Sequence, residues 1–237
     1  MKKIKKQNYV DLFYKEQPKL CDPKDFWGQV KRSVDGKPIS NSQIIMIENA
    51  VDKGLKLSKS DKVLDIGCGN GALSALFFKK INKLVGVDFS EYLIGVAKEN
   101  FEMKPDYTFH LADAYEFIVN YEHKEHITKV LCYGTFAYFD FQVAKKMLRF
   151  LNESYKNVSR VYIGNLPNKD KAENFYYKDI DYTEQIDDAE SPIGIWRSED
   201  EMKELAADCG WGINFHKMPK TFQGSHYRYD VILKRKL

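Results

Sequence analysis

Between residues 62 and 165, short apolar runs alternate with longer stretches in which apolar positions recur with a helical period. The short runs have the length of strands and span 62–66, 83–87, 107–111, 129–133 and 160–165, and the helical stretches span 71–80, 91–101, 114–121 and 141–153. Strand and helix alternation of this kind predicts right-handed crossovers and a mostly parallel sheet with helices on both faces. Such sheets bind ligands at the carboxyl ends of their strands.

The flanking segments extend this pattern. Residues 40–54 have the spacing of an amphipathic helix, with Ser40 or Ser42 as its cap, and 198–207 form a second helix with Ser198 and Glu201 in capping-box positions. Residues 212–217 and 226–234 are expected to form two further strands, joined by a short loop, as an antiparallel hairpin. The predicted fold is therefore an α/β, Rossmann-like, seven-stranded and mostly parallel sheet with a C-terminal antiparallel hairpin.

The composition is that of an ordinary soluble globular protein, with 43% hydrophobic and 30% charged residues in 237. The 37 basic and 34 acidic residues leave a net charge of only +3, which does not favour a nucleic-acid partner. No apolar run has the length of a membrane span, and the basic start is not followed by an apolar segment. We therefore expect a cytoplasmic protein without a membrane partner.

Cysteines and aromatic residues change this picture little. The four cysteines are widely spaced and form no C-x-x-C pair, so neither a zinc ribbon nor a disulfide framework is indicated. Aromatic residues are unusually frequent, with 15 Tyr and 15 Phe. They could fill a core or line a small-molecule pocket, and composition leaves both open.

The most distinctive feature is the glycine-rich string from Asp65 to Ala72, where a buried strand turns into a helix. Gly67, Gly69 and Gly71 allow a tight turn and a close approach of the backbone to a ligand. The string also satisfies the dinucleotide pattern G-x-G-x-x-[GA]. However, Asp65 would place a carboxylate beside a bound pyrophosphate, which is unfavourable, whereas it would attract a ligand with an ammonium group.

Acidic residues also end the next two predicted strands. Asp88 follows Gly69 by 19 residues, the spacing at which a carboxylate accepts hydrogen bonds from a ribose diol. Phe89 then offers a ring face to an adenine. Asp113 could accept from an exocyclic amine, or it could cap the following helix. Three carboxylates at three strand ends suit an adenosine that carries a cationic amino-acid tail.

These motifs resemble the class I S-adenosylmethionine-dependent methyltransferases. The resemblance implies that Asp65 and the three glycines hold the methionyl part of the cofactor, Asp88 the ribose and Asp113 the adenine amine. It implies S-adenosylmethionine as cofactor and S-adenosylhomocysteine as product. The residues expected at the cofactor are Tyr14, Asp65, Gly67, Gly69, Asn70, Gly71, Asp88, Phe89, Asp113, Ala114 and Tyr133.

The residues after Tyr133 bear on the acceptor. They contain neither the Asn/Asp-Pro-Pro-aromatic motif of enzymes that methylate nucleobase amines nor an acidic metal ligand of the catechol type. We therefore expect a metal-independent enzyme that acts on a small molecule. His226, at the start of the last strand, is the candidate general base, because histidine exchanges protons near neutral pH; the alternative is a surface histidine in a loop. Arg228, on the same strand face, is expected to bind an acceptor carboxylate or phosphate, or to pair with Asp230.

Two segments outside the core pattern are expected to complete the pocket. Residues 1–39 are interpreted as an N-terminal lid and 40–237 as the methyltransferase domain, with a substrate-recognition insert near 166–197; the alternatives are that Phe26 and Trp27 only staple the extension to the core and that the insert is a solvated face. His123 and His126 precede the fourth strand and are interpreted as surface residues. The expected substrate contacts are Phe26, Trp27, Tyr138, Asn165, Tyr227 and Arg228.

The sequence thus predicts methyl transfer to a small-molecule hydroxyl by in-line displacement. The layout of Phe26-Trp27, residues 165–167, Trp196 and residues 226–230 also resembles bacterial enzymes that methylate sugars or other components of surface polysaccharides. N-methylation of a small amine, a non-catalytic S-adenosylmethionine-binding module and, from the glycine pattern alone, a nicotinamide oxidoreductase remain alternatives. A homodimer is left open.

Overall fold

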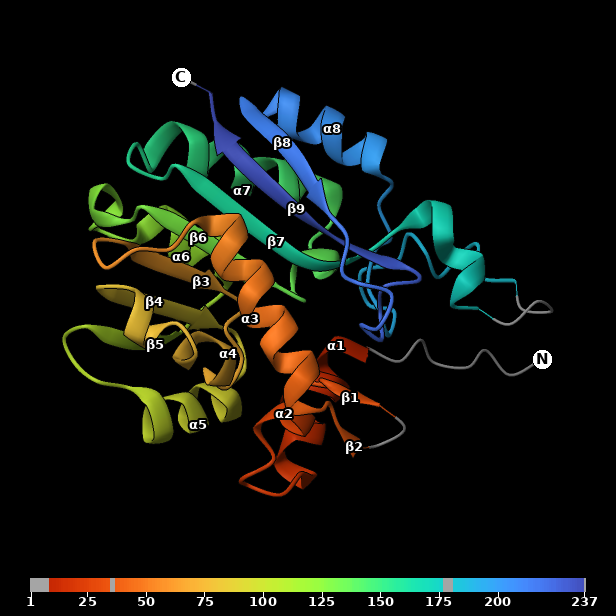
Figure 1. Ribbon diagram of the computed structural model, residues 1–237, viewed down its shortest axis with the longest axis horizontal. Coiled ribbons are helices and arrows are strands. Elements are labelled where there is room, and N and C mark those ends of the chain that lie inside the picture. The colour runs from red at the N-terminus through yellow and green to blue at the C-terminus, as the bar shows by residue number, and fades with distance from the viewer. Residues whose placement is uncertain (1–8, 35–36, 177–180, 237) are drawn as a thin grey trace.

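The computed structural model describes residues 9–34, 37–176 and 181–236. The basic start at residues 2–6 and Tyr177 of the expected insert lie outside these ranges. The described chain contains a seven-stranded sheet with the order β5-β4-β3-β6-β7-β9-β8 (Figure 1). Its strands are β3 (Lys62–Ile66), β4 (Lys83–Asp88), β5 (Tyr107–Leu111), β6 (Lys129–Tyr133), β7 (Arg160–Pro167), β8 (Trp211–His216) and β9 (Arg228–Arg235).

The predicted fold class is confirmed. The first five strands pair in parallel, whereas β9 pairs antiparallel with both β7 and β8. The expected start of the last strand was wrong: β9 begins at Arg228, so His226 and Tyr227 lie in the preceding turn. The amides of Tyr227 and Arg228 both donate to the Gly224 carbonyl, at 3.2 and 2.9 Å, and this turn delays the start of the strand.

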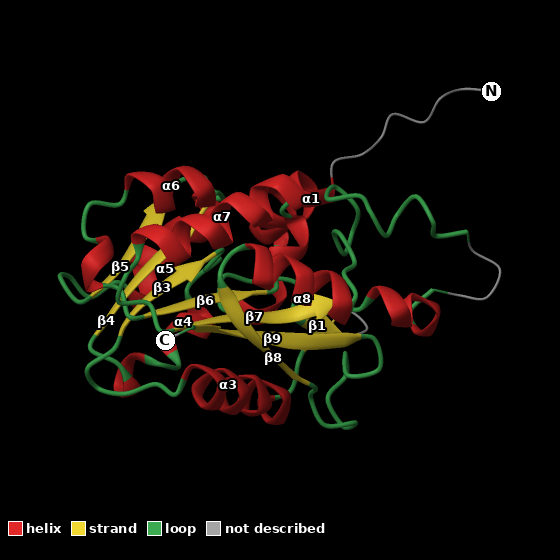
Figure 2. Ribbon diagram, turned by 90° about the horizontal axis from the view of Figure 1, so that it is seen from above, coloured by secondary structure: helices red, strands yellow, loops and turns green. Residues whose placement is uncertain are grey.

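Helices cover both faces of the sheet. The apolar side chains of α3 (Asn41–Leu55), α4 (Ala72–Ala75) and α5 (Glu91–Phe101) share one buried cluster. Those of α6 (Ala114–Asn120), α7 (Phe141–Ser154) and α8 (Glu199–Asp208) share the other. In Figure 2, α3 lies on one side of the sheet, and α6 and α7 lie on the opposite side.

The strands supply both clusters by alternation. In β3, Val63 packs into the cluster of α3, while Leu64 and Ile66 pack into that of α7. In β6, Leu131 packs into the cluster of α3, and Val130 packs into that of α7. Since side chains of a strand alternate between faces, an almost continuous apolar run is what a strand buried on both sides requires.

Two helix starts follow from capping. Ser40 accepts a hydrogen bond from the Gln43 amide at 3.5 Å and caps α3. Ser198 and Glu201 form the predicted capping box of α8, with bonds of 3.0 and 2.7 Å. Both caps satisfy amide groups that a helix start otherwise leaves without partners.

The helix expected at 71–80 is shorter than predicted. It consists of α4 and, after a break, the 3₁₀ helix η3 (Phe78–Lys80). The Leu76 and Phe77 amides donate to carbonyls only three residues back, at 3.2 and 3.0 Å. This tighter winding ends the α-helical geometry within about one turn.

The N-terminal segment packs at the carboxyl ends of the parallel strands. Its elements are α1 (Tyr9–Asp11), the π-helix η1 (Leu12–Glu16), the 3₁₀ helix η2 (Gln17–Leu20), α2 (Phe26–Gln29) and the antiparallel pair β1 (Ser33–Val34) and β2 (Lys37–Pro38). Three further 3₁₀ helices are η4 (Lys124–His126), η5 (Phe136–Tyr138) and η6 (Lys169–Asn174). Among the described helices, none is long and apolar enough to cross a membrane.

Candidate active site

A cavity of about 350 Å³ lies at the carboxyl ends of β3, β4, β5 and β6. Val10, Val30 and Arg32, from the N-terminal segment interpreted above as a lid, line it on one side, and Pro192 and Ile193 contribute from the segment before α8. The structure brings most of the predicted site residues together here: the lining includes Tyr14, Gly67, Gly69, Asp88, Phe89, Asp113, Ala114, Tyr133, Tyr138, Asn165 and Arg228.

The turn after β3 requires its glycines. Gly67 and Gly69 have φ angles of +70° and +57°, in the left-handed region that favours glycine. A Cβ atom at Gly67 would lie 2.2 Å from the Thr135 hydroxyl oxygen. The turn is held against the neighbouring strand, because the Gly67 and Cys68 amides both donate to the Val87 carbonyl, at 2.8 and 3.0 Å.

Asp88 ties the turn to the end of β4. Its buried carboxylate accepts hydrogen bonds from the amides of Gly69 and Ser90, each at 2.9 Å. Burial raises the pKa of Asp88, and the two amides act in the opposite direction. The carboxylate is thus oriented by the backbone at the cavity wall, where the sequence placed a ribose contact.

Asp65 lies beneath the cavity rather than in its lining. Its carboxylate is 2% exposed and accepts a hydrogen bond of 2.5 Å from the Ser74 hydroxyl. Burial raises the pKa of Asp65 to about 6, although Ser74 and the guanidinium of Arg32 act to lower it. Asp65 therefore acts on the cavity only through its charge, because its side chain is not part of the lining.

Asn70 and Gly71, also predicted at the cofactor, lie outside the cavity lining. The side-chain amide of Asn70 donates to the Phe26 carbonyl at 2.7 Å and to the Gln29 side chain at 2.8 Å. These bonds attach α2 to the glycine turn. Gly71 faces the core, where a Cβ atom would approach Phe109 to 2.9 Å. The two residues hold the turn and the lid in place.

At the adenine end expected from the sequence, Phe89 and Asp113 both line the cavity. Asp113 caps α6, since its Oδ1 accepts from the amides of Tyr115 and Glu116, at 2.8 and 3.0 Å. The Phe89 ring is 38% exposed, and the Lys15 ammonium lies 5.2 Å from its centre. Asp113 therefore caps α6, which was the alternative to an adenine contact, and it also borders the cavity.

The lid is joined to the domain by a pair of tyrosines. The hydroxyls of Tyr14 and Tyr138 are 3.2 Å apart, and that of Tyr138 also donates to the Pro192 carbonyl at 3.1 Å. The Ser90 hydroxyl donates to the Tyr14 carbonyl at 2.5 Å. Three separate segments, the lid, η5 and the chain before α8, thus meet over the cavity.

Sequence reasoning missed Arg32. This half-buried lid residue lies 5.1 Å from the centre of the Tyr133 ring and lines the cavity. Burial lowers the pKa of its guanidinium, and the nearby Tyr133 and Asp65 act to raise it. No motif marks Arg32, because its position depends on how the irregular lid folds back over the strand ends.

Phe26 and Trp27 do not line the described cavities. Phe26 packs edge-on against Phe101 of α5, with ring centres 5.1 Å apart, and Trp27 packs on the cluster beneath α3. The structure thus places them as the staple between lid and core, the alternative to a substrate contact.

A second cavity, of about 320 Å³, adjoins the first and contains the predicted His226 and Tyr227. His226 is exposed in the turn before β9, and its carbonyl accepts from the Asn174 side chain at 3.1 Å. The two cavities share part of their lining: Lys31, Arg32, Tyr133, Asn165 and Arg228. His226 therefore lies next to the first cavity and not in its wall.

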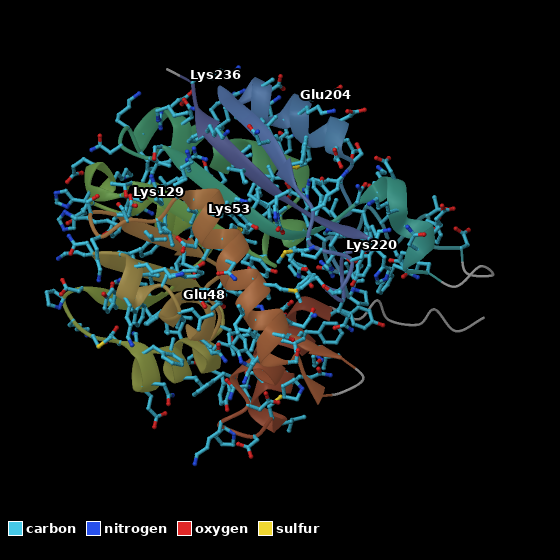
Figure 3. The ribbon with its side chains drawn as sticks, viewed as in Figure 1. Glu48, Lys53, Lys129, Glu204, Lys220 and Lys236 are labelled. Atoms are coloured by element: carbon cyan, nitrogen blue, oxygen red, sulfur yellow. The ribbon has the colours of Figure 1, made fainter. Side chains whose placement is uncertain are left out.

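His123, Glu125 and His126 form an exposed group whose ligand atoms lie within 4.8 Å of one another. They surround η4, directly before β6 begins at Lys129. Figure 3 shows Lys129 well separated from Lys220, which lies in the connection between β8 and β9 near the second cavity. The histidine group is therefore separate from the candidate site, as expected.

A sheet in this order, with a glycine turn after its first parallel strand and acidic residues at the two following strand ends, has the fold of the class I methyltransferases. Residues 63–157 match the family described as "Methyltransferase domain". The resemblance stated from the motifs is thereby confirmed for this part of the chain.

Individual relatives agree with this assignment. An uncharacterized methyltransferase of Schizosaccharomyces pombe is 32% identical over 79 residues, which cover 32% of this chain and 28% of the relative. The methyltransferase domain of bacterial CtHen1 superposes with a TM-score of 0.59 at 17% identity, over 83% of this chain and 99% of that domain. Magnesium protoporphyrin IX methyltransferase from Synechocystis superposes with a TM-score of 0.57 at 17% identity, over 97% and 98%. These structures establish the fold.

The buried carboxyl of Asp65 gives a prediction for stability. Because its pKa is raised to about 6 in the folded protein, folding favours its protonated form, and the unfolding free energy should fall as pH rises from about 4 to 6. We expect Asp65→Asn to remove about 3 kcal/mol of this decline. Urea unfolding at pH 4, 5, 6 and 7 measures it, with Glu204→Gln on the exposed side of α8 as control (Figure 3). Parallel pH profiles for Asp65→Asn and wild type would contradict the assignment.

Proposed function

We propose that this protein is an S-adenosylmethionine-dependent methyltransferase that acts on a small molecule. The observation that carries the proposal is the meeting of the glycine turn, the backbone-oriented Asp88 carboxylate and Asp113 around one cavity. All three lie within the segment that matches the methyltransferase domain. Several solved structures of the same fold are described as S-adenosylmethionine-dependent enzymes, which supports the choice of cofactor.

The residues of the cavity fit this cofactor. Gly67 and Gly69 leave the turn without side chains, so a ligand can approach the backbone closely. We assign Asp88 to the ribose diol and the exposed ring of Phe89 to the adenine face. When bound, S-adenosylmethionine supplies a methyl group carried on a positively charged sulfur.

The other end of the cavity suits the amino-acid part of the cofactor. Arg32 lines the wall beside Tyr133 and is assigned to the methionyl carboxylate. Asp65, buried close to Arg32, adds negative potential for the ammonium group. A cation and an anion side by side match the two opposite charges of an amino acid.

The lid residues are assigned to positioning and to the exclusion of water. The Tyr14–Tyr138 contact and the bond from Ser90 to the Tyr14 backbone hold the lid over the cavity. An in-line displacement gains most of its rate from holding the acceptor and the methyl group in one geometry. A segment held over the cavity therefore serves the reaction by limiting the positions that the acceptor can take.

We assign the acceptor atom to a hydroxyl oxygen, with a sugar or surface-polysaccharide component as the candidate substrate. In this reaction a C–O bond forms, the C–S bond breaks, and the hydroxyl proton leaves to a base. His226 is the proposed base, because the second cavity in which it lies shares five residues with the first. The end of β6 presents Tyr133 and Gly134 and no carboxylate, so we assign no metal to the transfer.

Methyl transfer itself is tested with the purified protein, methyl-labelled cofactor and a panel of hydroxyl and amine acceptors. We expect label in an O-methyl product and an equal amount of S-adenosylhomocysteine. An N-methyl product would replace the hydroxyl assignment by the amine one. Tight cofactor binding without turnover of any acceptor would favour a binding module.

Asp88 should be essential for cofactor affinity. We expect Asp88→Ala to weaken binding of S-adenosylhomocysteine by roughly 10- to 100-fold, since a charged group that accepts hydrogen bonds is lost. Calorimetric titration measures the affinity. The control is Asp106→Ala, which removes an exposed carboxylate that pairs with Lys83 at the other end of β4. Equal affinity of Asp88→Ala and wild type would refute the proposed cofactor site.

His226→Ala tests the general base separately. We expect turnover to fall at every pH tested, because the group that takes the hydroxyl proton is lost. Affinity for S-adenosylhomocysteine should stay at the wild-type value, because His226 lies outside the first cavity. Turnover equal to wild type at every pH would exclude His226 as the base.

A further inference from the structure

The second cavity has a positively charged lining. Lys31, Arg32 and Arg228 contribute three cations, and among its described lining residues there is no aspartate or glutamate. Low-dielectric walls strengthen the field of such a group of like charges. Of the other twelve lining residues, six are apolar or aromatic: Ile39, Ile47, Tyr133, Phe175, Phe222 and Tyr227.

Arg228 is the cation fixed at the junction of the two cavities, and it lines both. Its guanidinium donates to the Asn165 carbonyl at 2.5 Å and lies 4.8 Å from the centre of the Tyr227 ring. A guanidinium has five N–H donors, so one such bond orients it and leaves further donors for a ligand.

Asp230, the acid expected as an alternative partner of Arg228, is engaged elsewhere. Its carboxylate accepts from the Tyr162 hydroxyl at 2.6 Å and from the Asn165 amide at 2.7 Å, and it lies 3.1 Å from His216 Nδ1. No carboxylate within the described ranges forms an ion pair with Arg228. The positive charge of Arg228 is thus left for the cavity.

A bulge in β7 creates this arrangement. The register between β7 and β9 shifts between Ile163 and Leu166, and Asn165 has a φ of +63°, which non-glycine residues rarely adopt. The bulge directs the backbone N–H of Asn165 to Asp230 and the backbone carbonyl of Asn165 to Arg228. One strained residue thereby separates the acid from the guanidinium.

The other two cations have local contacts. The Lys31 ammonium donates to the Gln17 side chain and lies 4.3 Å from the centre of the Phe13 ring. Arg32 lies beside Tyr133 and is assigned to the cofactor. They add positive potential to the second cavity, while Arg228 offers it a guanidinium for direct contact.

We propose that the methyl acceptor carries a carboxylate or phosphate group and that this group binds Arg228 in the second cavity. The inference deepens the proposed function and rests on it. With its anionic group on Arg228, the acceptor extends along the wall that the two cavities share, so that its reacting atom lies between the methyl donor in the first cavity and His226 in the second. The aromatic walls contact the uncharged part of the molecule.

The test measures the binding of three probes that share a phenyl ring to the protein saturated with S-adenosylhomocysteine. Phenyl phosphate, benzoate and the neutral benzyl alcohol are titrated by calorimetry, and inorganic phosphate is added as a competitor. We expect at least one anion to bind more tightly than benzyl alcohol. Comparing the affinity for phenyl phosphate with that for benzoate shows which of the two anionic groups the site prefers.

Arg228→Gln should weaken binding of the preferred anion by roughly 10- to 100-fold, the usual effect of losing a charge-assisted contact. Arg228→Lys, which keeps the charge but not the planar fork, should recover part of the affinity. The charge-matched control is Lys220→Gln, because Lys220 is exposed in the neighbouring loop and outside both described linings (Figure 3). This control should bind the anions as wild type does.

Affinity for S-adenosylhomocysteine, measured in every variant, reports folding and separates the two proposals. If Arg228→Gln binds S-adenosylhomocysteine and also binds the anions as wild type does, the anion site is refuted while the cofactor site stands. The anion site would also be refuted if wild type bound benzyl alcohol and both anions with equal affinity. If wild type does not bind S-adenosylhomocysteine, the proposed function fails, and anion binding that depends on Arg228 would then still establish the anion site itself.

Discussion

The hydrogen bonds of Asp88 with the amides of Gly69 and Ser90 are the contact on which the rest of the candidate site depends. Through them one buried carboxylate joins the glycine turn, the end of β4 and the start of α5. Ser90 in turn caps α5 and donates to the backbone of Tyr14 in the lid. A single polar centre therefore connects the parallel sheet to the segment that covers it, and the hydrogen bonds that the carboxylate accepts offset part of its cost of burial.

The lid depends on this centre and on Asn70. Asn70 bonds to α2 from within the glycine turn, so the segment that closes the cavity is attached to the turn that forms its floor. Phe26 adds an apolar contact with α5. The attachment of the N-terminal segment and part of the cavity wall are thus built from adjacent residues of one turn, and a change in the turn would affect both.

Local patterns predicted the sheet well, because the strands are buried on both faces and their apolar runs are nearly continuous. β3, β5 and β6 have the predicted bounds. Gly67, Gly69, Asp88 and Asp113 line the cavity, as predicted, because their positions follow from strand ends, whereas Gly71 faces the core. Arg32 was missed, and Phe26 and Trp27 were expected in contact with substrate, since the path of the lid depends on long-range contacts such as that of Asn70. The bulge at Asn165 has no local signal either, because it depends on pairing with β9.

The five residues that the two cavities share have a consequence for how the cavities can be occupied. A group in either cavity can contact side chains, such as those of Arg32 and Arg228, that also line the other. Any effect that one occupant has on the affinity for a second is reciprocal, because thermodynamic linkage returns the same factor in both directions. The shared wall is thus the place where two ligands of this protein would influence each other.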